Sequence, residues 1–201
     1  MKNLIKYLLI PSILFAMCFT SYGQNPTNKK THKIGTPDYL LVKRGFKIFK
    51  LGTPIEQYRK YVVLVAGRDE HGDSRLYKLL TSTHPGFASI GDSIEINDII
   101  LEEYNGIIAG INVLVEAKYK GALLRSLQAA YGPGSKANPY IERYTWHASG
   151  KKTDISLTYI DSYEGGGHLH GNAWALFQDN NIANKQEQDE KNKAKETVKD
   201  L

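Results

Sequence analysis

The segment Leu51-Gly52-Thr53-Pro54-Ile55-Glu56 marks a change from strand-like to helix-like sequence, and it constrains the fold more than any other stretch of the chain. Thr53 is a residue type that caps helices, and Pro54 suits the first helical position. Glu56 stands three residues after Thr53, where a capping box places its carboxylate. Large side chains then recur at helical spacing at Tyr58, Tyr61, Val62 and Val65. The pattern predicts a helix that begins at Pro54 and is closed by Gly67.

Strand-like sequence lies on both sides of this predicted helix. The strand candidates are residues 38–50, 74–80 and 93–101, the last with a bend at Asn97-Asp98. The turn Tyr104-Asn105-Gly106 follows, and residues 107–115 return as a β-rich strand. Because Asn-Gly between apolar runs is a strong hairpin signal, the sequence predicts an antiparallel hairpin here.

The second half repeats this order of elements. Leucines at helical spacing predict a helix over residues 119–131, stopped by Gly132-Pro133. Three alternating strands follow at residues 140–146, 153–160 and 172–177. The sequence therefore predicts an α+β fold of two helix-plus-three-strand repeats, about residues 38–117 and 118–181. The repeats are expected to form an antiparallel sheet with the helices packed on one face.

Residues 1–23 have the organisation of a secretory signal peptide. Its parts are a positive start with Lys2 and Lys6, an apolar run over residues 7–19, and small residues at Ser21 and Gly23. The apolar run is short for a membrane span and contains Pro11, so a membrane anchor is the weaker interpretation. We expect cleavage after Gly23, a periplasmic or secreted location, and no stable membrane insertion of the mature chain.

Cysteine content and charge exclude several kinds of function. Cys18 is the only cysteine, and the Phe15-Ala16-Met17 before it departs from the lipoprotein signal pattern. After cleavage no cysteine is left, which excludes disulfides, thiol catalysis and Cys-ligated zinc. The net charge of +5 falls to +3 when Lys2 and Lys6 leave with the signal. That charge is too mild and too scattered to predict nucleic-acid binding.

The ends of the mature chain are polar. Residues 24–37 are predicted to be a flexible lead, and residues 38–181 a single α+β domain. Residues 182–201 form a tail dominated by Lys, Glu, Gln, Asp and Asn, which predicts a frayed solvated helix or a disordered segment. A partner-binding tail is the alternative.

A helix start at Gly52-Thr53 with Glu56, and a helix end at Tyr131-Gly132-Pro133, occur in a tandem arrangement of helices and meandering strands behind a signal peptide. This arrangement resembles the tandem β-lactamase-inhibitor-protein-like fold and the small outer-membrane assembly lipoproteins that share that repeat. The resemblance covers about residues 45–178. It implies binding of proteins through an exposed sheet face, without catalysis.

The stretch Gly165-Gly166-Gly167-His168-Leu169-His170-Gly171 is the one candidate metal site. His168 and His170 stand at i and i+2, so on a strand both would project from the same face. Asp161 or Glu164 could complete such a site. The alternative is a glycine-rich hairpin loop with solvated histidines.

Four aromatic residues form the candidate protein-binding site. Tyr140, Tyr144 and Trp146 share one strand face by the period of two, with Tyr159 adjacent. Large aromatics on an open sheet face make good interface anchors. The alternative is that these residues face the helices, in which case the interface idea fails. Trp174, in the apolar run 173–177, is expected in the core.

We find no nucleophile elbow, metalloprotease helix or phosphate loop in the sequence. We therefore expect an exported, non-enzymatic binding or interaction protein of the bacterial cell envelope, without a cofactor and with an unidentified protein partner. The alternative is a metal-binding protein or metal-dependent hydrolase centred on His168 and His170.

Signal cleavage is directly testable. In an exporting Gram-negative host the mature protein should begin at Gln24, with or without cyclisation to pyroglutamate, and intact-mass spectrometry measures this. A mature species that begins at Cys18 and carries added lipid mass would contradict the prediction and indicate a membrane anchor.

Overall fold

The computed structural model describes residues 33–67, 74–80, 84–161 and 171–199. The chain divides into residues 1–30, all outside the described residues, and a unit of residues 31–201 that holds the fold below. The predicted signal peptide and the His168 and His170 pair also lie outside the described residues.

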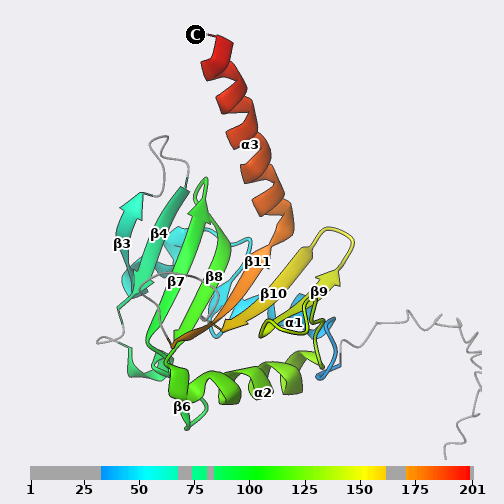
Figure 1. Ribbon diagram of the computed structural model, residues 1–201. Coiled ribbons are helices and arrows are strands. Elements are labelled where there is room, and N and C mark those ends of the chain that lie inside the picture. The colour runs from blue at the N-terminus through cyan, green and yellow to red at the C-terminus, as the bar shows by residue number, and fades with distance from the viewer. Residues whose placement is uncertain (1–32, 68–73, 81–83, 162–170, 200–201) are drawn as a thin grey trace, which may run out of the picture. The chain divides into compact units, whose positions relative to one another are not determined.

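The central feature is a seven-stranded antiparallel sheet with the order β3-β4-β7-β8-β11-β10-β9 (Figure 1). Its strands are β3 (Val62–Gly67), β4 (Ser74–Leu79), β7 (Asp98–Tyr104), β8 (Ile107–Val115), β9 (Arg143–Ser149), β10 (Asp154–Asp161) and β11 (Ala173–Asp179). Strands β8 and β11 lie at the centre, and β3 and β9 form the two edges. The predicted α+β class and antiparallel sheet are confirmed.

The hairpin of β7 and β8 forms as the sequence predicts. Asn105 and Gly106 both have positive φ, at 50° and 82°, which is the geometry of a type I′ turn. Asn tolerates this conformation and Gly adopts it without strain, so the turn matches the twist of the two strands. Residues 96–97 separate β7 from the short strand β6 (Ile94–Glu95), where a bend was expected.

Helices and small hairpins complete the fold. They are α1 (Tyr39–Lys43), β1 (Gly45–Phe46), β2 (Phe49–Lys50), η1 (Ile55–Tyr61), η3 (Pro85–Phe87), β5 (Ser89–Ile90), β6 (Ile94–Glu95), η4 (Ala117–Tyr119), α2 (Lys120–Tyr131) and α3 (Asn180–Lys199). The predicted helix over residues 119–131 is confirmed as α2. Gly132 ends it with φ of 87°, and its N–H donates back to the Gln128 carbonyl.

The helix predicted from Pro54 to Gly67 is wrong over its second half. Only Ile55–Tyr61 is helical, as a 3₁₀ turn, and Val62–Gly67 is the edge strand β3. The run of β-branched residues at positions 62–65 explains the difference, because such side chains favour strands. Thr53 makes no capping bond to η1, since its Oγ1 donates to the Lys50 carbonyl at 2.6 Å.

The stretch predicted as strand over residues 38–50 is likewise divided. It forms helix α1 followed by the two-residue strands β1 and β2. Arg44 and Lys47 have positive φ, so the chain turns sharply twice within this stretch. Leu40 and Phe49 are fully buried, and the stretch therefore acts as a cover for the core.

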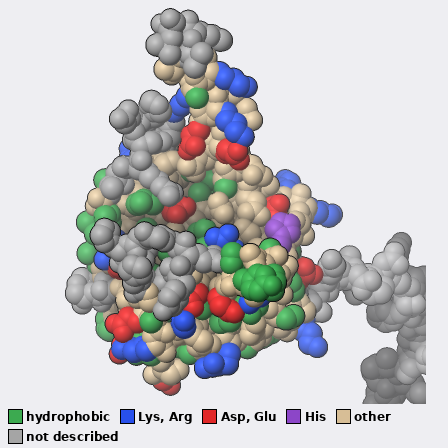
Figure 2. Space-filling model, in the orientation of Figure 1, with side chains coloured by type: hydrophobic (Ala, Val, Ile, Leu, Met, Phe, Trp, Pro, Cys, Tyr) green, Lys and Arg blue, Asp and Glu red, His purple; other side chains and the backbone are tan. Residues whose placement is uncertain are grey.

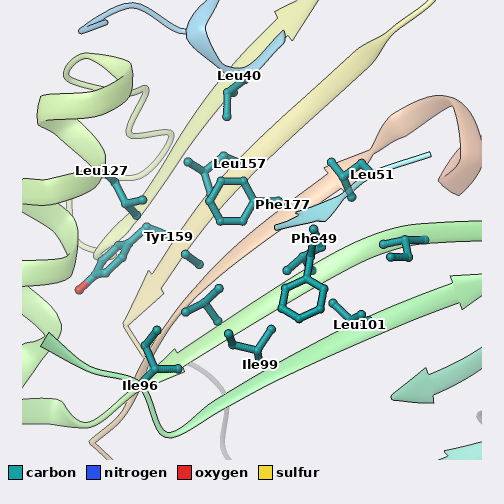
Figure 3. Close-up of a cluster of buried hydrophobic side chains, with 14 of the residues drawn as sticks. Leu40, Phe49, Leu51, Ile96, Ile99, Leu101, Leu127, Leu157, Tyr159 and Phe177 are labelled. Atoms are coloured by element: carbon teal, nitrogen blue, oxygen red, sulfur yellow. The ribbon is translucent and has the colours of Figure 1, made fainter. Parts of the chain in front are cut away.

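The core lies between one face of the sheet and the elements that cover it. Along β10, Ile155, Leu157 and Tyr159 alternate toward this core face. Figure 3 shows Leu40, Leu51 and Leu127, from the covering segments, pointing toward strand residues such as Leu157 and Phe177. Helix α2 contributes Leu123, Leu127 and Tyr131 to the core. We call the opposite side of the sheet the open face.

The charged tail is helical. Helix α3 follows β11 directly, and the Asp179 carboxylate accepts from the N–H groups of Asn181 and Ile182 at 3.1 and 3.4 Å. These contacts satisfy amides that a helix start leaves without partners. None of the described helices is both long enough and apolar enough to cross a bilayer.

Substitution of Trp146 tests which face of the sheet is covered. It is 1% exposed and its Nε1 donates to the Gly132 carbonyl at 2.8 Å. Trp146→Ala should lower the free energy of unfolding by about 3 to 5 kcal/mol, because it empties a packed aromatic site. Urea titration of the mature protein measures this. Tyr140→Ala, at a residue 94% exposed, is the control and should change it by less than about 0.5 kcal/mol. Equal effects of the two substitutions would contradict the fold.

Candidate functional site

The four predicted binding aromatics do not form an exposed surface. Tyr144 and Tyr159 are directly opposed across β9 and β10, and Trp146 lies on the same face. That face is the core face: Trp146 is 1% and Tyr159 2% exposed. Tyr140 is exposed but lies before β9 begins. The prediction of a common face holds for three residues, and the prediction that this face is open is wrong.

Helix α2 is the physical reason for this burial. The Tyr159 hydroxyl donates to the Lys120 carbonyl at 3.4 Å, and Lys120 Nζ lies 2.8 Å from Asp161 Oδ2. These contacts hold the start of α2 against β10. Burial, aided by the nearby charge of Asp161, raises the pKa of the Tyr159 hydroxyl, so it remains a neutral donor.

The metal hypothesis receives no test from the structure. His168 and His170 lie outside the described residues, and so does Glu164. Within the described ranges no three His, Cys, Asp or Glu side chains are grouped so that they could hold a metal ion. Asp161, the other proposed ligand, is buried and engaged with Lys120.

The open face of the sheet carries a cluster of apolar side chains, which is the candidate binding site. Trp174 is paired in register with Leu114 on one side and Ile160 on the other, and Leu176 follows two residues along β11. Ile100 lies across Asn112 from Leu176. All five apolar side chains are half-buried. We define this set, Ile100, Leu114, Ile160, Trp174 and Leu176, as the open-face cluster.

Paired polar groups surround the open-face cluster. Lys78 and Asp98 form an ion pair at 2.7 Å, and Asn112 Nδ2 donates to Glu102 at 2.8 Å. On the β9 side, His147 Nε2 lies 2.5 Å from Asp154 Oδ1. An apolar centre with a polar rim is the usual anatomy of a protein interface.

A groove lies where α3 leaves the sheet. It has a volume of about 350 Å³ and is lined by Glu102 and Gln178 of the open face and by Asn184, Glu187 and Glu190 of α3. The Tyr104 hydroxyl donates to Asp189 at 2.6 Å and ties the helix to β7 beside it. Figure 2 shows the charged side chains that run along α3 above this face. The lining is polar and acidic, which suits a positively charged or amide-rich segment.

The two tryptophans lie on the opposite faces of the sheet from those that the sequence predicts. Trp146 was expected at an interface and is buried, whereas Trp174 was expected in the core and lies on the open face. Trp174 Nε1 is buried without an acceptor among the described residues. The alternation of Trp174, Leu176 and Gln178 with Ala173, Ala175 and Phe177 is visible in the sequence. It is the signal that could have identified this second face.

Asp154 connects the open face to the start of α3. Its Oδ1 accepts from Asn180 Nδ2 at 3.0 Å, and Asn180 Oδ1 accepts from the Ser156 hydroxyl at 2.9 Å. The hydrogen bond from Asn180, followed by the charge of His147, holds the pKa of the Asp154 carboxyl below its ordinary value. Asp154 is the described partner of His147, and no described nucleophile is bonded to His147.

Acid titration should measure the contribution of the Asp154 carboxyl to the free energy of unfolding. A carboxyl with a lowered folded-state pKa stabilises the fold above its unfolded-state value, about 3.9, and that stability is lost as the pH falls through the folded-state pKa. Unfolding free energies measured below about pH 4 should therefore fall less steeply in Asp154→Asn than in the natural chain. Asn180→Ala, which removes the first cause of the shift, should flatten the curve in the same direction. Parallel curves for all three proteins would contradict the assignment.

No family model, curated protein or solved structure matches this chain. The resemblance to the β-lactamase-inhibitor-protein-like fold therefore stays a prediction.

Proposed function

We propose that this chain is an exported, non-enzymatic binding protein that takes a protein partner on the open face of its sheet. The observation that carries the proposal is the open-face cluster, which places Trp174 between Leu114 and Ile160 with paired polar groups around it. A sheet needs only one covered face for stability, and here the other face keeps large apolar side chains. Such a face is favoured for association.

Trp174 is the proposed anchor. Tryptophan is enriched among the residues that dominate binding energy, especially near the centre of an interface. Its neighbours on three strands would surround it and exclude water from the contact.

The acidic lining of the groove beside α3 favours a positively charged segment of the partner. Glu102, Glu187 and Glu190 line the groove together with amide side chains. A segment that carries Lys or Arg next to an apolar residue would meet the groove with its charge and the open-face cluster with its apolar side chain. The rim charges would guide the approach and set the orientation of the partner.

We also propose that the chain is exported and that its sheet contains an internal duplication. The signal-like residues 1–23 support export to the periplasm or beyond. The strand order supports duplication: counted outward from the centre, β8, β7 and β4 mirror β11, β10 and β9, while the edge strand β3 has no counterpart. Each half ends on its central strand, and a helical element precedes each half, η1 before β3 and β4, and α2 before β9.

Site-specific crosslinking tests the proposed face. A photoreactive amino acid at Thr158 or at Ile100, both half-buried on the open face, should crosslink one protein in the envelope of the producing cell. The same group at Arg125, on the exposed side of α2, is the matched control and should give no such product. Trp174→Ala should abolish the product formed from Thr158 while the protein stays folded by circular dichroism.

Two results would contradict this function. One is crosslinking of equal yield from Arg125, which would mean that contact is not confined to the open face. The other is an unchanged yield from Thr158 in folded Trp174→Ala, since truncation of an anchor residue typically weakens binding by about 2 kcal/mol or more, roughly thirtyfold.

A further inference from the structure

A second, separate cavity lies on the core-face side of the sheet, where η1 meets the turn between β7 and β8. Its volume is about 200 Å³, and it is lined by Ile55, Glu56 and Arg59 of η1, Arg75 of β4, Glu103 of β7 and the Asn105-Gly106 turn. We call it the Glu103 cavity. The side chains of Glu56 and Arg59 are 70% and 42% exposed, so the cavity opens to solvent beside them.

Glu103 is the unusual member of this lining. It is 5% exposed, and one carboxylate oxygen, Oε1, accepts from the backbone N–H of Gly106. The other oxygen, Oε2, is buried and has no hydrogen-bond partner among the described residues. A buried carboxylate oxygen without a donor is costly, because it has lost its water and gained nothing in exchange. Glu103 is therefore a buried carboxylate in the cavity wall whose capacity to accept hydrogen bonds is only partly used.

Arg75 supplies the opposite charge at the same cavity. It is the register partner of Glu103 across β4 and β7, so both side chains leave the same face of the sheet. Among the described residues no hydrogen bond or ion pair involves the guanidinium of Arg75, which is exposed. The Arg75 guanidinium and the Glu103 carboxylate thus face one space without closing on each other.

The other two charges of the lining are already matched. Arg59 Nε donates to Glu56 Oε1 at 2.9 Å, and the Arg59 guanidinium lies 4.8 Å from the centre of the Tyr77 ring. Because Glu56 and Arg59 pair with each other, the Glu103 carboxylate and the Arg75 guanidinium are the two charged groups of the lining that remain. The space beside Gly106 is open as well, since a Cβ placed there would meet no atom within 4 Å.

We propose that the Glu103 cavity binds a small zwitterion of the α-amino-acid class, with its ammonium group at the Glu103 carboxylate and its own carboxylate at the guanidinium of Arg75. Guanidinium and carboxylate groups match in a two-bond fork, and an ammonium donates a charge-assisted bond to a carboxylate. A cavity of this volume holds about six waters, which is room for a small amino acid and too little for a drug-sized ligand.

A ligand with only one of the two charges fits this cavity poorly. A simple carboxylate would engage Arg75 and leave the Glu103 carboxylate without a further donor, and it would also place two anions near each other. A simple ammonium would do the reverse. Binding by the zwitterion should therefore exceed that of either half, and this preference separates the proposed site from a surface that attracts ions in general.

Titration with matched probes tests the proposal. Glycine, L-alanine and L-serine are the zwitterionic probes, and acetate and methylammonium are the half probes, each added to the mature protein and followed by amide chemical shifts. The zwitterions should shift the amides of residues 55–59, 75 and 103–106 in a saturable manner. Acetate and methylammonium should each bind at least about tenfold more weakly, as expected for the loss of one charged hydrogen bond.

Two substitutions and one control identify the residues that bind. In Glu103→Gln the amide oxygen can still accept from Gly106, but an NH₂ donor replaces Oε2, so affinity for the zwitterions should fall about ten- to a hundredfold. Arg75→Gln, at an exposed residue, should have an effect of the same size. Glu56→Gln lines the same cavity and is the control, with affinity within about twofold of the natural chain.

Several outcomes would overturn the proposal. If no zwitterion causes saturable shifts of these amides, water alone fills the cavity and the proposal is wrong. Binding of acetate or methylammonium as strong as that of the zwitterions means that the cavity does not use both charges. If Glu103→Gln fails to fold, Arg75→Gln decides, because its side chain is exposed. Unchanged affinity in that variant removes the site. None of these results bears on the open face, which lies on the other side of the sheet.

Discussion

The pairing of β8 with β11 is the interaction on which the rest of the structure depends. It joins two meanders that are far apart in sequence, and its register sets Phe177 beside Ile111 and Ala175 beside Val113 on the core face. The same register sets Trp174 beside Leu114 on the open face. Because strand side chains alternate, a slip of one residue would exchange these two sets and expose the core. The register therefore specifies both the core and the candidate binding surface.

The covered side of the sheet is held by contacts of several kinds. Aromatic rings link the covering segments to the strands, as where Phe46 and Tyr131 both lie against Phe177. The Lys120 and Asp161 pair adds a charged contact at the start of α2, and the hydrogen bond from Trp146 Nε1 to the Gly132 carbonyl adds a neutral one at its end. Since α2 is tied at both ends, its apolar residues Leu123, Leu127 and Tyr131 stay in the core. This arrangement leaves the opposite face without a comparable cover among the described residues.

Local signals in the sequence were sufficient for the hairpin at Asn105-Gly106 and for α2, because turn chemistry and a leucine stripe act over a few residues. They failed over residues 54–67, where a capping-box pattern competed with a β-branched run and the pairing of β3 with β4 decided the outcome. Alternation grouped Tyr144, Trp146 and Tyr159 correctly but could not say which face the helices cover. That choice depends on where α2 packs, which is a tertiary property. The Glu103 cavity was equally beyond reach, since it brings together η1, β4 and β7.

Strand β3 forms one edge of the sheet, and Val63, Leu64 and Val65 are exposed along it. Figure 2 shows hydrophobic side chains at this margin. An apolar edge of this kind is a template onto which strands of other molecules can add, and repeated addition leads to open-ended polymers. The shift of register between Leu64 and Ala66 interrupts the regular spacing that such growth requires. One extra residue in an edge strand therefore works against the addition of further strands to this edge.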